Sequence, residues 1–141
     1  MKGHSHITKS EIDMFKLLDS VRDRSSGGIA IFVGTVRDRN EGRGVSGLTY
    51  ETYRKMAERK MIDIEKSAAS KFPVKRIAAV HRYGKLKVGD VSVAVAVSCE
   101  HRADAFDACR YVIDEIKSLV PLWKKETLRS GEERWVEGKW Q

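Results

Sequence analysis

The sequence has 141 residues, of which 41% are hydrophobic and 33% charged, a balance that excludes a disordered or fibrous chain. We expect a single domain over residues 1–141 with a frayed segment at 1–8, and a cytoplasmic location, because no apolar run approaches the ~20 residues of a membrane span and the N-terminus lacks the apolar core of a secretory signal. The formal net charge of +7 fits an anionic partner, which could be a nucleic acid, a phosphorylated metabolite or an acidic protein.

The first predicted elements are a helix and a buried strand. Thr8-Lys9-Ser10-Glu11 has the pattern of a capping box, and apolar residues recur behind it at helical spacing, so we expect a helix from about residue 9 to residue 24. An apolar, β-branched run predicts a buried strand over residues 29–36. Gly34 inside this run indicates a bulge or the close approach of another backbone.

The rest of the chain alternates pairs of strands with helices that end before Pro73 and Pro121, because proline stops a helix. The predicted elements are a loop at 37–46, a strand at 48–53, a helix at 56–72, a strand at 76–83, a turn with a short extended piece at 84–90, a strand at 91–98, a helix at 103–118 and strands at 122–128 and 134–140. The order αββαββαββ predicts an α+β fold with largely antiparallel strand pairs.

The cysteines and the N-terminal histidines indicate neither a disulfide framework nor a metal site. Cys99 and Cys109 are the two cysteines of the chain, and they lack the spacing of a metal-binding pair. Cys109 lies among apolar residues on a predicted helix, which favours a buried, inert thiol, whereas Cys99 is either buried or reactive. His4 and His6 lie on the segment expected to fray, with no further ligands nearby, so we predict no metal there.

Two lysines flank Pro121 in an otherwise apolar segment. Because proline ends a helix, Lys117 should lie on the last helical turn and Lys124 on the segment that turns back from it. Two ammonium groups beside apolar residues repel each other and resist desolvation, which a pocket for an anionic substrate would explain. A lysine whose neutral form is favoured in this way can transfer protons near neutral pH. The alternative is that both lysines extend to solvent along an apolar surface.

Two further segments place cations at the ends of predicted elements. Arg37 follows the buried strand at 29–36, and His101 and Arg102 lie between the strand at 91–98 and the third helix. The backbone N–H groups at a helix start, reinforced by these two side chains, suit a phosphate group. Each segment also has an ordinary explanation, as a solvated loop cation or a polar pair at a helix start.

Together these segments resemble a known family, the catalytic (large) subunit of molybdopterin synthase. The resemblance covers roughly residues 28–138 in order and spacing, and the segment before Gly28 is its least similar part. Glu100 stands where the family usually has a small residue. The motifs that carry the resemblance are Gly-Thr-Val-Arg at 34–37, His-Arg-Tyr-Gly-Lys-Leu at 81–86 before Gly89-Asp90, Glu-His-Arg at 100–102, Pro-Leu-Trp-Lys-Lys-Glu at 121–126 and Arg134-Trp135-Val136.

The resemblance implies a reaction and its partners. The family's enzyme is a sulfurtransferase that converts cyclic pyranopterin monophosphate (precursor Z) to molybdopterin by adding two sulfurs as a dithiolene. The sulfur arrives as a thiocarboxylate on the C-terminal Gly-Gly tail of a small ubiquitin-like subunit. The large subunit is typically a homodimer within a heterotetramer. The matching residues require no metal and no organic cofactor.

The resemblance also implies roles for individual residues. The two lysines associated with catalysis match Lys117 and Lys124, although the sequence does not assign a step to either. Both reactants are anions, so cations must offset their repulsion when they meet. The residues that match the family's substrate-binding positions are Thr35, Val36, Arg37, His101, Arg102, Lys125 and Glu126.

Two other functions fit parts of the sequence. One is a small basic RNA-binding α+β module, in which Tyr50, Tyr53 and Tyr83 would provide stacking surfaces on strands. No basic–aromatic ribonucleoprotein signature surrounds these tyrosines, however. The other is a non-catalytic dimerisation or scaffold protein whose edge strands pair with a partner, which leaves the Lys117–Lys124 pair unexplained.

Overall fold

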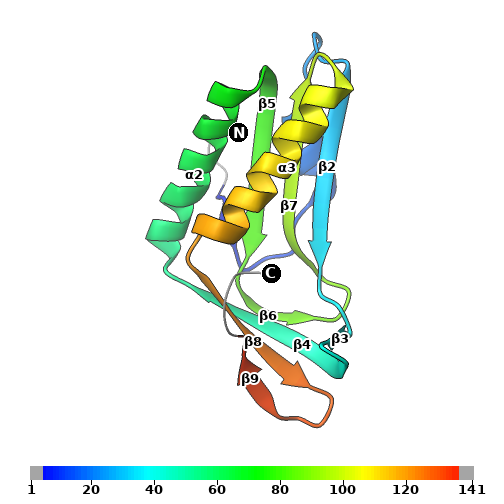
Figure 1. Cartoon of the computed structure of the whole chain (residues 1–141), viewed down its shortest axis with the longest axis vertical. Helices are drawn as coiled ribbons and strands as arrows, with labels where there is room; N and C mark the ends of the chain where they lie inside the picture. Colours follow the sequence, from blue (N-terminus) through cyan, green and yellow to red (C-terminus); the bar gives the residue numbers. More distant parts are fainter. Residues whose placement is uncertain (1–4, 137–141) are drawn as a thin grey trace.

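The computed structural model describes residues 5–136 as two β-sheets and three helices (Figure 1). The first sheet contains, in spatial order, β1 (Ile7–Thr8), β5 (Val74–Arg82), β7 (Val91–Cys99) and β2 (Gly28–Thr35). The second sheet contains β3 (Arg39–Asn40), β4 (Arg43–Thr52), β8 (Leu122–Leu128) and β9 (Glu133–Trp135), with β6 (Gly84–Lys87) paired to β4. The helices are α1 (Met14–Ser20), α2 (Arg54–Lys71) and α3 (Arg102–Leu119).

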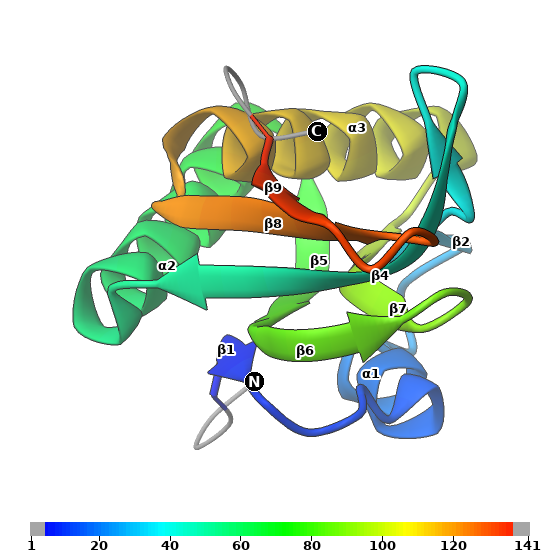
Figure 2. The same cartoon turned by 90° about the horizontal axis from the view of Figure 1, so that it is seen from below.

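The predicted α+β class with largely antiparallel pairing is confirmed. Within the described residues, the only parallel pair is β1 with β5. Helices α2 and α3 cover one face of the first sheet, and α1 packs on the opposite face (Figures 1 and 2). The second sheet crosses the end of the first sheet at which β2 and β5 finish (Figure 1). None of the described helices is both long enough and apolar enough to span a membrane.

Strand β7 is buried on both faces, as its small alternating residues predict. Its valines Val93, Val95 and Val97 belong to the large apolar cluster beneath α2 and α3. Its alanines Ala94 and Ala96 belong to a smaller cluster beneath α1. The strand can be covered from both sides because side chains alternate across a sheet and its alanine face leaves room for a second layer.

The first helix is shorter than predicted. It begins after Asp13, whose carboxylate accepts a hydrogen bond of 3.1 Å from the backbone N–H of Lys16, and it ends at Ser20. The hydroxyl of Thr8 instead accepts a hydrogen bond of 3.1 Å from the backbone N–H of Ser10. The predicted capping box is therefore wrong, because this threonine stabilises a turn that precedes the helix.

The predicted loop at 37–46 is wrong over much of its length, because β3 and the first residues of β4 form a hairpin there. Its turn consists of Glu41 and Gly42, both with positive φ (51° and 77°). Glycine and charged residues thus mark the tip of a hairpin here rather than an open loop. The last predicted strand is confirmed only in its first residues, and residues 137–140 lie outside the described residues.

The expected fraying of residues 1–8 is wrong for residues 5–8, whereas residues 1–4 lie outside the described residues. Ile7–Thr8 forms β1, which pairs with His81 and Arg82 of β5. The carboxylate of Glu58 on α2 accepts hydrogen bonds from the backbone N–H groups of His6 (2.8 Å) and Ile7 (3.1 Å). These bonds satisfy backbone donors that a two-residue strand leaves unpaired.

His6 ties this segment to α2 by charge. Its Nδ1 lies 2.7 Å from Glu58 Oε1 and its Nε2 lies 3.0 Å from Glu65 Oε1. Burial alone would lower the pKa of His6, but the hydrogen bonds and charges of Glu65 and Glu58 outweigh burial and raise it above 6.5. Burial alone would raise the pKa of Glu58, but the hydrogen bonds from His6 and Ile7 lower it overall.

We expect His6→Ala to destabilise the protein by about 1–2 kcal/mol near pH 6 and by clearly less near pH 9. The folded-state pKa of His6 is raised, so its contribution is fully present below 6.5 and is lost as the pH rises through the folded-state value. Urea unfolding of both forms at the two pH values measures the difference. His101→Ala, which removes an exposed histidine, is the control. If the destabilisation caused by His6→Ala grew with pH, it would contradict a stabilising interaction between charged His6 and the two glutamates.

Candidate active site

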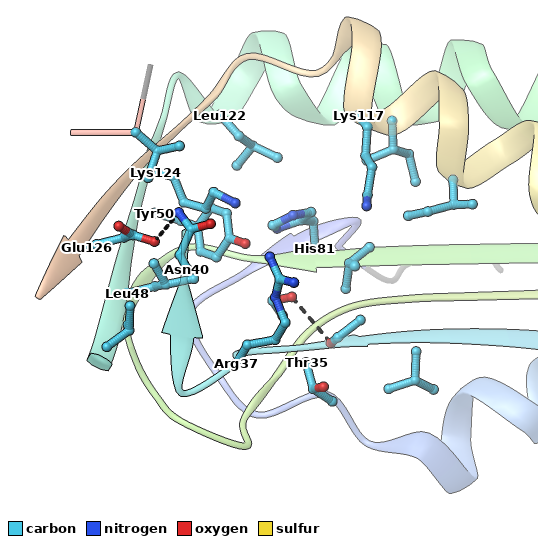
Figure 3. Close-up of a pocket in the computed structure, with 18 of the residues that line it drawn as sticks. Thr35, Arg37, Asn40, Leu48, Tyr50, His81, Lys117, Leu122, Lys124 and Glu126 are labelled. Carbon is cyan, nitrogen blue, oxygen red and sulfur yellow. Dashed lines mark hydrogen bonds between the residues drawn. The ribbon is translucent and has the colours of Figure 1, made fainter. Parts of the chain in front are cut away.

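A cavity of about 640 Å³ lies where the first sheet, the end of α3 and the second sheet meet (Figure 3). Its walls carry more cations than anions, which suits a negatively charged ligand. Its volume is in the range of pockets that hold small organic ligands. The charged side chains that line it are Arg37, Arg39, Lys117 and Lys124, with Glu41 and Glu126.

The end of β2 delivers Thr35 and Arg37 to the cavity. The register with β7 shifts between Gly34 and Thr35, and a Cβ on Gly34 would lie 2.7 Å from Cγ1 of Val93. The predicted bulge is therefore confirmed, whereas the atom that approaches Gly34 belongs to the side chain of Val93 and not to another backbone. The chain leaves the sheet just after this bulge, so the Arg37 guanidinium extends towards the cavity (Figure 3).

The two lysines lie where the proline between them predicts. Lys117 is on the last turn of α3, where a cation also complements the helix dipole. The chain then reverses at Pro121 and continues as β8. Leu122, Lys124 and Glu126 alternate along β8 and all line the cavity.

Glu126 is the buried acidic residue of the cavity wall, with 3% of its surface exposed. Its carboxylate accepts hydrogen bonds from Asn40 Nδ2 at 2.7 Å and from Arg134 Nε at 3.0 Å. A buried carboxylate needs such partners, so β3 and β9 are both tied to β8 at this point. Asn40 was not among the predicted site residues, because its partner lies far along the sequence.

The charges around Lys124 favour its neutral form. Burial lowers the pKa of Lys124 most strongly, the carboxylate of Glu126 opposes this effect, and the charges of Lys117 and Arg37 lower the pKa further. The net result is a pKa below the ordinary lysine value of 10.5. An amine in this state can donate and accept a proton closer to neutral pH than a solvated lysine can.

His81 and Tyr50 also line the cavity, and sequence reasoning gave neither a role in the site. Their rings pack edge to face at 4.9 Å. His81 is 6% exposed, and its Nδ1 lies 2.7 Å from the carbonyl oxygen of Arg82. Two signals were available for His81: it begins the motif at 81–86, and the alternation of β5 places it on the same face as Ile77 and Ala79, which belong to or pack against the core.

His101 and Arg102 do not reach the cavity of their own chain. Both are exposed at the first turn of α3, and the rise of a helix separates them from Lys117 by about 24 Å. Glu100 pairs with His101 at 3.5 Å. The resemblance predicted that His101 and Arg102 lie in one site with the two lysines. In the structure, His101 and Arg102 lie at the start of α3 and Lys117 lies at its end.

Val36 and Lys125 also lie away from the cavity lining. Val36 is 3% exposed, and its backbone N–H donates a hydrogen bond of 3.0 Å to the carbonyl of Asp90. Lys125 alternates to the outer face of β8, where its Nζ lies 3.8 Å from Glu133 and 5.3 Å from the ring centre of Trp135. Of the nine predicted site residues, the cavity brings together Thr35, Arg37, Lys117, Lys124 and Glu126.

The remaining sequence alternatives lose support. Burial, and then the charge of Asp104, raise the pKa of the fully buried Cys99, so its thiol is not activated. Cys109 is buried as predicted, and burial raises its pKa to about 11. Tyr50 is buried in the cavity while Tyr53 is exposed, so the tyrosines form no common stacking surface. Among residues 5–136, no group of three or more acidic, histidine or cysteine side chains is arranged for a metal ion.

Residues 7–119 match the family model described as MoaE protein. The chain belongs to this family. It is 49% identical over 121 residues to the molybdopterin synthase catalytic subunit of Oryza sativa subsp. indica, in an alignment that covers 86% of this chain and 63% of that protein. The chain thus matches less than two thirds of the length of this relative.

Solved structures share the MoaE-family fold. The molybdopterin synthase of Staphylococcus aureus is similar with a TM-score of 0.89 and 34% identity, over 95% of this chain and 97% of that chain. A protein–protein complex of subunits 1 and 2 of the molybdopterin-converting factor from Helicobacter pylori 26695 includes a chain with a TM-score of 0.74 and 19% identity, over 93% of this chain and 88% of that chain. At this identity the second likeness concerns the fold alone.

In this MoaE-family chain, the pKa of Lys124 should move in opposite directions in two variants. Glu126→Gln removes the carboxylate that favours the ammonium form, so the pKa of Lys124 should fall further. Lys117→Met removes a repelling charge, so the pKa should rise. Titration of the Lys124 side chain by NMR measures both changes. Equal values in the two variants would show that the three side chains are not electrostatically coupled.

Proposed function

We propose that this chain is the catalytic subunit of a molybdopterin synthase, a sulfurtransferase that converts cyclic pyranopterin monophosphate (precursor Z) to molybdopterin. The observation that carries the proposal is the convergence of Lys117, Lys124 and Arg37 on one cavity in a chain of the MoaE family. The names of the rice and staphylococcal relatives support it. We also propose a cytoplasmic location, on the sequence grounds given above.

The sulfur donor in this proposal is a small ubiquitin-like subunit that carries a thiocarboxylate on its C-terminal Gly-Gly tail. Relatives such as the rice protein are named catalytic subunits, which implies a further subunit and supports a partner of this kind. A thiocarboxylate and a cyclic phosphate repel each other, and Lys117, Lys124 and Arg37 offset that repulsion. The cavity is large enough for a pterin and the end of a thin peptide tail.

The proposed sulfur transfer requires a proton donor at a defined step. In each transfer the sulfur forms a bond to a carbon of the pterin side chain, and water cleaves the acyl–sulfur bond so that the small subunit leaves with a carboxylate. The oxygen displaced from the pterin side chain needs a proton to depart, which the ammonium group of Lys117 or Lys124 supplies. Lys124, whose pKa is lowered chiefly by burial, suits this exchange.

We propose that a second copy of the chain supplies His101 and Arg102 to the site. Among the described strands, β2 is one of the two edges of the first sheet and exposes Ile29, Ile31 and Val33, each 37–41% accessible. The start of β2 lies against Arg102, because a Cβ on Gly28 would be 3.4 Å from the Cα of Arg102.

This arrangement favours an antiparallel homodimer along β2. The strand is about 23 Å long, close to the length of α3 that separates Arg102 from Lys117. Two copies packed antiparallel along β2 therefore bring the Arg102 end of one chain to the Thr35 end of the other. With one small subunit on each large subunit, the assembly is a heterotetramer.

We expect Lys117→Ala and Lys124→Ala to fold normally and to lose about 100-fold or more in the rate of dithiolene formation, because each variant removes a cation and a proton donor from the cavity. The assay combines the chain with thiocarboxylated small subunit and precursor Z, and measures molybdopterin. Lys85→Ala, which removes an exposed lysine of β6, is the matched control. Near-normal turnover in both cavity variants would refute the assignment.

If each site contains residues from both chains of the dimer, two inactive variants should recover activity when they are mixed. In a mixed dimer of Lys124→Ala and Arg102→Ala chains, one site carries both defects and the other carries neither. Random exchange of subunits should then recover about a quarter of wild-type activity. The measurement is the same assay after the two variants are unfolded and refolded together. If Arg102 acted in its own chain, the mixture would stay as inactive as its components.

A further inference from the structure

His81 occupies the middle of the cationic cavity. Figure 3 shows its ring between the side-chain ends of Lys117 and Lys124, with the guanidinium of Arg37 pointing towards the same place. These side chains come from β5, α3, β8 and the segment after β2. Hydrogen-bond donors from three separate parts of the chain therefore lie around a ring that β5 supplies.

The hydrogen-bond partner of the ring fixes its tautomer. Nδ1 lies 2.7 Å from the carbonyl oxygen of Arg82, and a carbonyl oxygen can only accept, so Nδ1 carries the hydrogen. Nε2 is then left with its lone pair. Tyr50 packs against the ring at a centroid distance of 4.9 Å and an interplanar angle of 75°, which holds the ring plane in place.

The ring is neutral in the resting protein. Burial lowers the pKa of His81 most strongly, the hydrogen bond to Arg82 opposes it, and the charges of Lys124 and Lys117 lower it further, to about 4. The charges that act on this ring are those of Lys124 and Lys117, and the Arg37 guanidinium points towards it (Figure 3). The other charged residues of the cavity wall are Arg39, Glu41 and Glu126. At neutral pH the cavity thus contains an uncharged acceptor among cations.

We propose that His81 is a positioning residue for Lys124: its Nε2 accepts a hydrogen bond from the Lys124 ammonium group and holds that group towards the reacting atoms. This inference rests on the proposed sulfur transfer for its catalytic meaning, and for the hydrogen bond it rests on the position of the His81 ring beside the end of Lys124 in the cavity (Figure 3). Lys124 has three N–H donors on a flexible stem. A bond to a fixed ring restricts the rotation of the stem and orients the ammonium group in the cavity.

A neutral acceptor is needed at this position for an electrostatic reason. A carboxylate here would hold Lys124 equally well, but its charge would cancel a cation and repel the thiocarboxylate and the phosphate. An imidazole without a charge orients the lysine and leaves the positive potential of the cavity intact.

The test uses three substitutions that separate the two sides of the ring. His81→Asn keeps an amide donor near the position of Nδ1, and so the bond to Arg82, but has no atom at the position of Nε2. His81→Gln places an amide oxygen near the position of Nε2 and can accept from Lys124. His81→Phe keeps the ring and removes both functions.

We expect His81→Asn and His81→Phe to lower kcat about tenfold to a hundredfold, the loss of one charge-assisted hydrogen bond, with little change in KM. His81→Gln should recover most of kcat. Rescue by asparagine and not by glutamine would overturn the proposal, since it would show that only the structural bond to Arg82 matters. Thermal unfolding of the three variants identifies any that lose the fold.

A second measurement does not depend on the reaction. NMR of the isolated chain should show the hydrogen of His81 on Nδ1, and the titration of Lys124 should change in the asparagine and phenylalanine variants and remain near wild type in the glutamine variant. A hydrogen on Nε2, or Lys124 titrations that are the same in all four proteins, would overturn the contact. If wild-type protein made no molybdopterin while these NMR results held, the proposed function would fail and the contact would stand.

Discussion

Three cations, Lys117, Lys124 and Arg37, line one cavity against their mutual repulsion, and most features of the site follow from this constraint. Partial desolvation of charged groups typically costs several kcal/mol per ion. The fold offsets part of that cost with Glu126, whose carboxylate is itself fixed by Asn40 and Arg134. Within the described residues, the cations that line the cavity still outnumber the carboxylates, and this favours an anionic ligand.

The cavity depends on the way the two sheets meet. The first sheet is a rigid layer with helices on both faces, and it contributes the ends of β2 and β5. The second sheet contributes the inward face of β8, which pairs with β4 from Val45 to Thr52. Because α3 leads directly into β8 through Pro121, one short segment fixes the separation of the two lysines. A change in the length of this segment would alter the site more than most substitutions in the walls.

The parts of the site that the sequence predicted are those governed by local rules. Proline limits α3, alternation places Lys124 and Glu126 on one face of β8, and Gly34 marks the bulge that releases Arg37. His81, Tyr50 and Asn40 were not predicted to act in the site, because their place depends on which strand faces lie between the sheets, a non-local property. The motif at His101 and Arg102 was recognised, but α3 places it about 24 Å from Lys117. The order of residues in a sequence motif does not show how far apart those residues lie in the folded chain. The capping box at Thr8 failed for a related reason, since a short polar side chain can serve a turn as well as a helix.

Glu65 connects the front of the chain to the strand that carries His81. One carboxylate oxygen bonds His6, and the other accepts the backbone N–H of Ala79 at 3.0 Å, two residues before His81 on β5. The N-terminal strand and the residues next to His81 therefore share one carboxylate, so a change at His6 removes one of its two partners. Sequence variation in the first strand can in this way reach the cavity wall without any change in a lining residue.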